Sequence, residues 1–188
     1  MKIICIDKSF EADYITLRSD SSVLRNNDNF YMPDFSKRME CTVGYYLRIT
    51  RLAKCISGKF ASRCYDAVGV AVAFTAQDVV ERLCKRGLPC DTAYCFDKSI
   101  ALSPDTIAPE AISEGRIKML ISGEQHSHDT TDGLRRLLDE ALVRASEVLT
   151  LKTGDIVYVA SSCPMPVAIG DSVEARLDDT EMLNFQIR

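Results

Sequence analysis

Two histidines and an aspartate lie close together in the segment His126-Ser127-His128-Asp129. If this segment is a strand, His126 and His128 share a face, because alternate side chains of a strand point to the same side. Two imidazoles and a carboxylate are suitable ligands for zinc or nickel. The flanking Gly123 and Thr130-Thr131-Asp132 also fit the exposed tip of a hairpin, and this is the interpretation that we favour.

Three possible nucleophiles are consecutive at Ser161, Ser162 and Cys163. A serine or cysteine nucleophile needs a base within hydrogen-bond reach, and the sequence places none beside these residues. The chain has eight cysteines but no CxxC pair, and their scatter argues against a disulfide framework or a zinc site. We expect reduced, mostly buried thiols, and a single reactive cysteine stays open as the alternative.

The composition of the chain indicates one globular domain. Its 188 residues are 46% hydrophobic and 27% charged, which excludes disordered and fibrous classes. The formal net charge of −4 lacks the basic surplus of a nucleic-acid binder. No run of apolar residues is long enough to cross a membrane, and the first residues become acidic too early for a signal peptide. We therefore expect a cytoplasmic protein that binds neither nucleic acid nor membrane.

Most of the predicted elements are short strands. β-branched, aromatic or alternating patterns predict strands at Lys2–Ile6, Val43–Ile49, Ile156–Ala160, Ser172–Leu177 and Met182–Ile187. The apolar segment Asp66–Thr75 is either a buried strand or a strand that leads into a helix. Residues 15–35 are rich in Ser, Asn and Asp, which favours loop over most of this region.

Two segments have helical spacing. Gln77–Arg86 carries apolar residues three and four positions apart and is followed by Gly87 and Pro89, which stop a helix. A second helix begins near Asp132, a good N-cap residue, and has one apolar face. That face consists of Leu134, Leu137, Leu138, Ala141, Leu142, Ala145, Val148 and Leu149.

Several short motifs resemble those of the fumarylacetoacetate hydrolase superfamily, in the same order and at similar spacing. They are Met32–Lys37 (MPDFSK), Val43–Leu52, Tyr65–Asp78 (ending FTAQD), Gly87–Ser99 (GLP and FDKS), Ser122–Glu124 (SGE), Leu151–Asp155 (LKTGD) and Ile169–Asp171 (IGD). Each motif alone is weak, but their common order supports the resemblance. It divides the chain into a shortened N-terminal segment, residues 1–30, and a core, residues 31–188, of one domain.

The resemblance implies a mainly β, α+β fold: a mixed β-roll or barrel of twisted strands with a few peripheral helices. It also implies a homodimer. Members of the superfamily cleave, isomerise or decarboxylate β-diketo and related oxo acids with the help of magnesium or calcium. Such hard cations need anionic oxygen ligands. The superfamily supplies them as a Glu-x-Glu pair on one strand and an aspartate just before the segment that resembles FTAQD.

All three of these carboxylate positions are changed in this chain. They are occupied by Thr42, Gly44 and Ala73. Glu40 lies two residues before Thr42 and could point to the same face, but one carboxylate is a poor magnesium site. The resemblance therefore implies that the magnesium or calcium site is lost and that no cofactor takes its place.

Other site positions of the superfamily also differ. The histidine base expected after the first strand is absent, Tyr94 replaces a substrate-contacting lysine, and Gln77 replaces an arginine. Ser161 and Ser162 fall in a substrate loop that is one residue shorter here. Lys98 replaces a glycine and either brings a positive charge to the site or is simply solvated, which we favour. Residues Gln77, Tyr94, Lys98, Ser161 and Ser162 are thus the candidate lining of a metal-free pocket.

Three hypotheses of function follow. The leading one is a catalytically degenerate member of the superfamily that retains a binding role, toward a small oxo acid or a protein partner. The alternative is an active hydrolase, isomerase or decarboxylase for an acylpyruvate-like oxo acid, with carboxylates recruited from Glu40, Asp97 or Glu124. A third is a structural subunit that pairs with an active paralogue.

Overall fold

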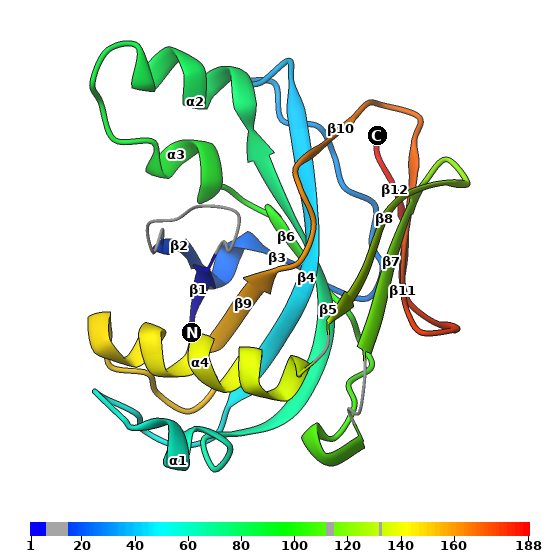
Figure 1. Cartoon of the computed structure of the whole chain (residues 1–188). Helices are drawn as coiled ribbons and strands as arrows, with labels where there is room; N and C mark the ends of the chain where they lie inside the picture. Colours follow the sequence, from blue (N-terminus) through cyan, green and yellow to red (C-terminus); the bar gives the residue numbers. More distant parts are fainter. Residues whose placement is uncertain (7–14, 112–114, 132) are drawn as a thin grey trace.

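The chain folds into two sheets and a few helices (Figure 1), as described by a computed structural model for residues 1–6, 15–111, 115–131 and 133–188. Among these residues the larger sheet has the strand order β2-β1-β9-β4-β5-β6-β3, and β10 pairs with β4. Its strands are β1 (Lys2–Ile6), β2 (Ile15–Ser19), β3 (Val23–Leu24), β4 (Met39–Ile49), β5 (Tyr65–Ala76), β6 (Ile100–Leu102), β9 (Ile156–Ala160) and β10 (Met165–Val167).

The smaller sheet has the order β12-β11-β7-β8 and is antiparallel throughout its described strands. Its strands are β7 (Gly115–Ile121), β8 (Glu124–Thr131), β11 (Ser172–Leu177) and β12 (Thr180–Gln186). The helices are α1 (Gly58–Ala61), α2 (Gln77–Cys84), α3 (Asp91–Tyr94) and α4 (Leu134–Val148), with 3₁₀ turns η1 (Asp20–Ser22) and η2 (Pro109–Ala111). The mainly β fold with peripheral helices is therefore confirmed.

The sequence-based prediction was wrong in parts of two regions. The region 15–35 was expected to be mostly loop, but it begins with a strand. Ile15–Ser19 pairs with β1 over the whole length of that strand. Helix α4 begins after Gly133, which has a left-handed φ of 72°, and Asp132 lies outside the described residues. Val148 does not belong to the apolar face of this helix, since it is 60% exposed at the helix end.

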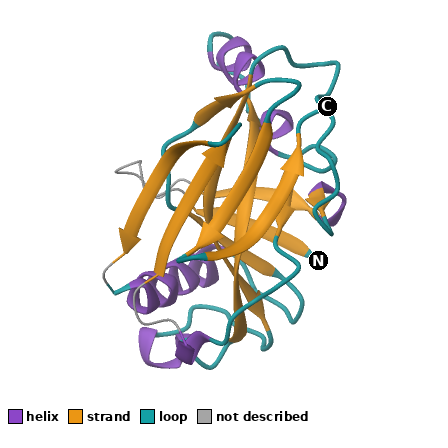
Figure 2. Cartoon of the chain, turned by 90° about the vertical axis from the view of Figure 1, so that its right-hand side faces the viewer, coloured by secondary structure: helices purple, strands orange, loops and turns teal. Residues whose placement is uncertain are grey.

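The main core lies on one face of the larger sheet. Alternate residues of β4, such as Val43, Tyr45 and Leu47, are fully buried there. The same core includes residues of α4 and of the smaller sheet, so both cover this face. Figure 2 shows the strands of the smaller sheet side by side, with α4 below them. The intervening residues of β4 point to the opposite face, because side chains alternate along a strand.

A second, smaller apolar cluster lies on that opposite face. It contains Tyr46 of β4, Ala71 and Ala73 of β5, and Tyr158 of β9. The small side chains of β5 leave room there for larger ones from neighbouring strands. The Tyr46 ring, for example, lies directly over Gly69, and its hydroxyl donates to the Ser103 carbonyl oxygen at 2.9 Å.

The last residue of each of two sequence motifs is an aspartate that forms hydrogen bonds to a distant segment of the chain. Asp78, at the end of the FTAQD segment, accepts hydrogen bonds from the Ser36 hydroxyl (2.7 Å) and the Lys37 backbone N–H (3.0 Å) of the MPDFSK motif. Asp155, at the end of LKTGD, accepts from the backbone N–H groups of Lys2 (3.0 Å) and Lys152 (2.8 Å) and pairs with the Lys2 ammonium group. Asp78 thus connects α2 to the segment before β4, and Asp155 connects the turn before β9 to β1.

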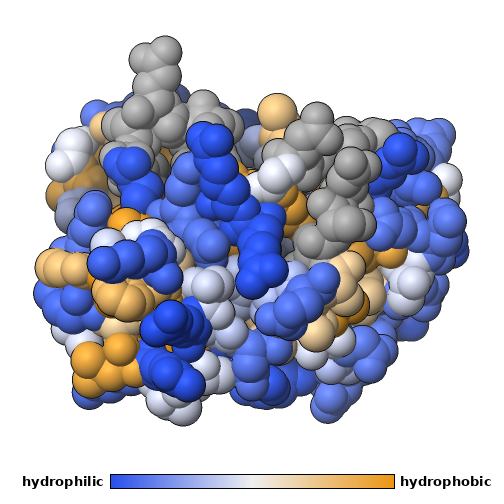
Figure 3. Space-filling model, turned by 60° about the horizontal axis from the view of Figure 1, so that its bottom comes forward, coloured by the Kyte–Doolittle hydropathy of each residue, from blue (hydrophilic) through white to orange (hydrophobic). Residues whose placement is uncertain are grey.

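None of the described helices has the length and apolar character that a bilayer crossing needs. The face at the bottom of Figure 1, seen in Figure 3, mixes polar residues with small apolar groups. Phe60 of α1, for instance, is 43% exposed and has the Lys59 ammonium group 4.9 Å from its ring centroid. The homodimer stays a prediction.

We expect Asp155→Asn to lower the free energy of unfolding at pH 7 by about 1–3 kcal/mol, since the buried charge-assisted hydrogen bonds are weakened. Burial by itself raises the pKa of Asp155, but the hydrogen bonds from Lys2 and Lys152 outweigh it, so the folded-state pKa is lowered. The stabilisation is therefore complete above the unfolded pKa of about 3.9 and is lost as the pH falls through the lower folded-state pKa.

Urea denaturation of wild type and variant at pH 7 and at successively lower pH measures this difference. Asp66→Asn, which removes the exposed partner of Arg48, is the control and should change stability by less than about 1 kcal/mol. A gap between Asp155→Asn and wild type that does not shrink in acid would contradict the assignment.

Candidate functional site

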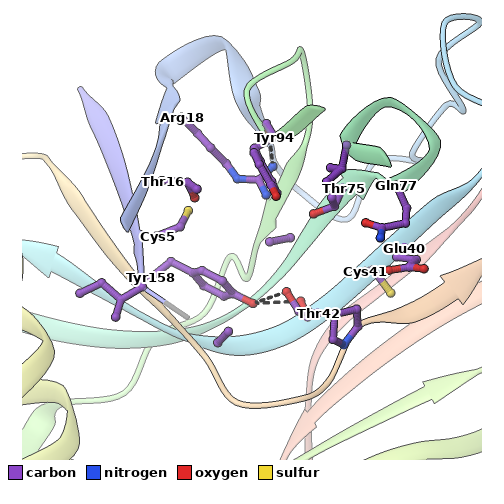
Figure 4. A pocket seen from close by; sticks show the side chains of 15 residues that line it. Cys5, Thr16, Arg18, Glu40, Cys41, Thr42, Thr75, Gln77, Tyr94 and Tyr158 are labelled. Carbon is purple, nitrogen blue, oxygen red and sulfur yellow. Dashed lines mark hydrogen bonds between the residues drawn. The ribbon is translucent and has the colours of Figure 1, made fainter. Parts of the chain in front are cut away.

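A cavity of about 220 Å³ lies on the face of the larger sheet opposite the main core (Figure 4). Strands β1, β2, β4, β5 and β9 form its floor and walls, and helices α2 and α3 and Pro164, just before β10, contribute the remainder. The lining residues are Cys5, Ile6, Thr16, Arg18, Glu40, Cys41, Thr42, Ala73, Thr75, Gln77, Val80, Tyr94, Tyr158, Ala160 and Pro164.

Strand register brings the central lining residues together. Thr42 of β4 is directly opposite Ala73 of β5, and Cys5 of β1 is opposite both Thr16 of β2 and Tyr158 of β9. Directly opposite residues of neighbouring strands project from the same face of a sheet. Two of the three positions that the resemblance assigns to a metal site, Thr42 and Ala73, thus fall at the cavity, from segments far apart in the sequence.

Of the predicted site residues, the structure brings Thr42, Ala73, Gln77 and Tyr94 together around this cavity. Gln77 begins α2 and Tyr94 ends α3, and both are partly buried. Gly44 lies two residues beyond Thr42 on β4 and is not part of the lining. Lys98, Ser161 and Ser162 are also outside the lining of this cavity.

The exclusion of the two serines and of Lys98 has simple structural reasons. The Ser162 hydroxyl accepts a hydrogen bond from the Val43 backbone N–H at 2.9 Å, and the N–H groups of Ser161 and Ser162 both donate to the Val43 carbonyl oxygen. This loop is therefore fastened to β4. Lys98 is exposed in a turn with a φ of 59°, a conformation that favours the glycine of the superfamily motif.

At Gly44, β4 lies very close to β9. A Cβ atom at this position would lie 2.1 Å from the Val159 carbonyl oxygen and 2.9 Å from both the Ala160 Cα and the Tyr158 ring. Two of these three atoms belong to the backbone, which cannot move aside as a flexible side chain can. The space that a glutamate side chain would need at residue 44 is therefore filled by β9 itself.

Tyr158 also occupies the hydrogen-bonding groups of Thr42. Its hydroxyl donates to the Thr42 carbonyl oxygen at 3.0 Å and lies 3.0 Å from the Thr42 Oγ1 atom (Figure 4). A phenol has one proton, so Thr42 donates its own hydroxyl proton to the Tyr158 oxygen. Burial raises the pKa of Tyr158 far above its usual value, which keeps this phenol protonated. Tyr158 and Thr42 thus form a neutral hydrogen-bonded pair on the cavity floor.

These residues do not fit a magnesium or calcium ion. Such ions are held by oxygen ligands that include carboxylates, with water or carbonyl oxygens in the other positions. Ala73 has no donor atom, Gly44 has no side chain, and the Thr42 hydroxyl is a neutral donor already bonded to Tyr158. Glu40 lines the cavity and is the single carboxylate among the lining residues that the structure describes.

The other residues considered as metal ligands lie elsewhere. Asp97 and Glu124 are exposed and do not line the cavity, and Glu124 belongs to the smaller sheet. His126 is exposed at a bulge in β8, where Met119 and Leu120 of β7 pair with Ser127 and Gln125. The side chains of His128 and Asp129 lie outside the described residues. Within the described part of the chain, no three His, Cys, Asp or Glu side chains are grouped as a metal site.

The two cavity cysteines are neutral thiols rather than thiolate nucleophiles. Burial raises the pKa of Cys5, and burial with smaller effects from Asp171 and Glu40 raises the pKa of Cys41 to about 12. Because the thiolate is the reactive form of cysteine, neither group is activated at neutral pH. None of the eight cysteines forms a disulfide. Cys5, Cys41 and Cys64 are buried, but Cys55, Cys84 and Cys163 are exposed, so the expectation of mostly buried thiols was wrong.

One cavity residue, Arg18, was missed from the sequence. It belongs to β2, in the region expected to be mostly loop, and only 4% of it is exposed. It lies opposite Ile3 of β1 and therefore on the cavity face. The alternation in Ile15-Thr16-Leu17-Arg18-Ser19, in which Leu17 is 46% exposed, was the available signal.

Comparison with known proteins agrees with this architecture. Residues 7–188 match the family model of the fumarylacetoacetate (FAA) hydrolase C-terminal domain. The chain belongs to this family.

Two curated relatives are oxaloacetate tautomerases. One, from Escherichia coli, is 29% identical over 114 residues, which are 58% of this chain and 52% of the relative. The other, the mitochondrial enzyme of Mus musculus, is 21% identical over 99% of this chain and 91% of its own length. Fumarylpyruvate hydrolase from Pseudomonas aeruginosa, solved with Mn²⁺ and pyruvate, has the same fold with a TM-score of 0.88 at 14% identity. That alignment covers 100% of this chain and 89% of the hydrolase.

We expect Gly44→Ala to destabilise the fold by at least about 1–3 kcal/mol, because a methyl group overlaps the β9 backbone. Gly58→Ala is the matched control, since a Cβ at residue 58 of α1 meets nothing within 4 Å. Chemical denaturation should show a clear loss for Gly44→Ala and none for Gly58→Ala. Equal stability of the two variants would show that β4 and β9 are not in close contact at this point.

Proposed function

We propose that this protein is a catalytically degenerate member of the family whose cavity binds a small oxo acid without a metal ion. The observation that carries the proposal is the replacement of the carboxylate positions by a packed, neutral structure. Gly44 lies against the β9 backbone, Thr42 bonds to Tyr158, and Ala73 offers no ligand. A glutamate cannot be restored at residue 44 unless the β9 backbone moves, so residues 42 and 73 are the two positions at which carboxylates could be reintroduced.

The class of ligand is supported by the cavity and by the relatives. Its lining combines one cation, Arg18, and one carboxylate, Glu40, with hydroxyl, amide and phenol groups. The cation and the neutral donors suit carboxylate and carbonyl oxygens. A volume of about 220 Å³ is below the roughly 300–1,000 Å³ of pockets for drug-sized ligands, which favours a small molecule. The two curated relatives act on oxaloacetate, and pyruvate was present with the Pseudomonas aeruginosa enzyme.

A second function is favoured by one residue. Glu40 has the same parity on β4 as Thr42 and lines the cavity, so it could act as a base or as a ligand in an active hydrolase, isomerase or decarboxylase. Turnover of an acylpyruvate or of oxaloacetate that depends on Glu40 would favour this alternative.

We further propose that the protein is a cytoplasmic homodimer.

The proposal predicts that divalent metals do not stabilise the wild-type protein. Mg²⁺, Mn²⁺ or Ca²⁺ at millimolar concentration should leave the melting temperature unchanged, with or without pyruvate. A ligand at about 100 times its Kd would add about 2.7 kcal/mol, a shift of several degrees for a domain of this size. A shift that requires metal and pyruvate together would instead support the active-enzyme alternative.

The double variant Thr42→Glu/Ala73→Asp tests whether the missing carboxylates explain this behaviour. Residues 42 and 73 are directly opposite each other, so two carboxylates introduced there share the cavity face. We expect this variant to gain a metal-dependent rise in melting temperature. Thr42→Gln/Ala73→Asn, which has the same shape without the charge, is the matched control and should gain none. No metal response in a folded double variant would mean that these two positions do not face a common site.

A further inference from the structure

Arg18 is a buried cation at the wall of the cavity. Its Nη1 atom donates to the carbonyl oxygens of Phe74 (2.9 Å), Tyr94 (2.6 Å) and Ser99 (2.7 Å). These bonds hold the guanidinium group between β5 and the segment that follows α3. The position of the charge is therefore fixed by backbone groups and not by a flexible side-chain partner.

The hydrogen-bonding capacity of Arg18 is incomplete. Its Nε–H is buried and has no hydrogen-bond partner. A buried donor without a partner costs about 1–3 kcal/mol, and more when it belongs to a charged group. Such a group inside a folded protein is a sign of a missing ligand or of a functional role.

The charge of Arg18 is also uncompensated within the part of the chain that the structure describes. No described carboxylate lies within ion-pair distance of it. Cys5, which lines the same cavity as Arg18, has a pKa that burial raises, so it is a neutral thiol and not a counter-ion. Figure 4 shows Arg18 and Glu40 on opposite sides of the cavity. A buried cation is otherwise almost always paired.

We infer that Arg18 is the anion anchor of this cavity and binds the carboxylate of a small 2-oxo acid in the absence of metal. This inference rests on the proposed function. It assigns to Arg18 the role that the metal ion has in the family, which is to pair with the negative charge of the ligand. A carboxylate beside Arg18 supplies the missing counter-charge. Arginine is suited to this role because its planar fork matches the two oxygens of a carboxylate.

The rest of the ligand would lie over the neutral groups of the cavity floor. Thr42 and Tyr158 are held together there by their hydrogen bond, and Thr75 and Gln77 lie toward Glu40 (Figure 4). The Thr42 hydroxyl proton is donated to Tyr158. The Thr75 hydroxyl and the Gln77 amide are the groups there that can donate to a keto or hydroxyl oxygen. The ligand thus has a carboxylate at one end, beside Arg18, and a neutral polar group at the other end, over the cavity floor.

The first test compares two ligands on the unmodified protein. Pyruvate and its neutral amide, pyruvamide, differ in charge but hardly in shape. In the presence of a chelator, titration calorimetry or ligand-observed NMR should show pyruvate binding at least about tenfold more tightly, because a charge-assisted hydrogen bond is roughly twice as strong as a neutral one. This comparison needs no variant and is therefore independent of folding defects.

The second test changes the anchor. Arg18→Lys keeps the positive charge but loses the fork, and we expect pyruvate to bind at least about tenfold more weakly to the folded variant. Lys98→Ala is the matched control, because Lys98 is an exposed cation near the same wall and does not line the cavity. Its affinity for pyruvate should equal that of the wild type.

The outcomes separate this inference from the proposed function. If pyruvate and pyruvamide bind equally well in chelator and Arg18→Lys binds like the wild type, the cavity binds an oxo acid but Arg18 is not its anchor. If pyruvate binds only with added Mg²⁺ or Mn²⁺, or does not bind at all at millimolar concentration, the metal-free function and the anchor are both overturned.

Discussion

The close contact between β4 and β9 at Gly44 is the constraint on which the site depends. Two backbones meet there with no room for a side chain, and this places the Tyr158 ring beside Gly44 and its hydroxyl against Thr42. The contact joins two central strands of the larger sheet, so it belongs to the folding of the sheet as much as to the cavity. A carboxylate at residue 44 would have to separate these strands. The neutral cavity floor is thus built into the strand packing.

The cavity floor is neutral, and the charged side chains of the cavity belong to its walls. Arg18 comes from β2 at one side and Glu40 from the start of β4 at the other. Three backbone carbonyl groups hold the guanidinium group in place but do not neutralise it. Within our account, the family's use of a metal to bind an oxo acid is replaced by a fixed cation of the protein. This change requires no rearrangement of the strands. β1 pairs with β2 on one side and with β9 on the other, so Arg18 of β2 and Tyr158 of β9 line the same cavity.

The sequence predicted the fold well and the site in part. Apolar alternation located β1, β9 and β11 with their observed ends, because strands that are buried on one or both faces carry a strong local signal. The motif order located Thr42 and Ala73 at the cavity. It could not show that Tyr158 lies beside Gly44, since that contact joins residues more than a hundred positions apart. Arg18 was missed because the polar residues around it indicated a loop, although pairing with β1 makes a strand.

X-ray diffraction at the manganese absorption edge, from crystals grown with Mn²⁺ and pyruvate, tests the central claim most directly. We predict no anomalous peak beside Thr42, Ala73 or Glu40, an intact hydrogen bond between Thr42 and Tyr158, and the pyruvate carboxylate next to Arg18. A manganese ion bound by Glu40 and by the oxygens of pyruvate would contradict the account and would place this protein with the metal-dependent enzymes of its family.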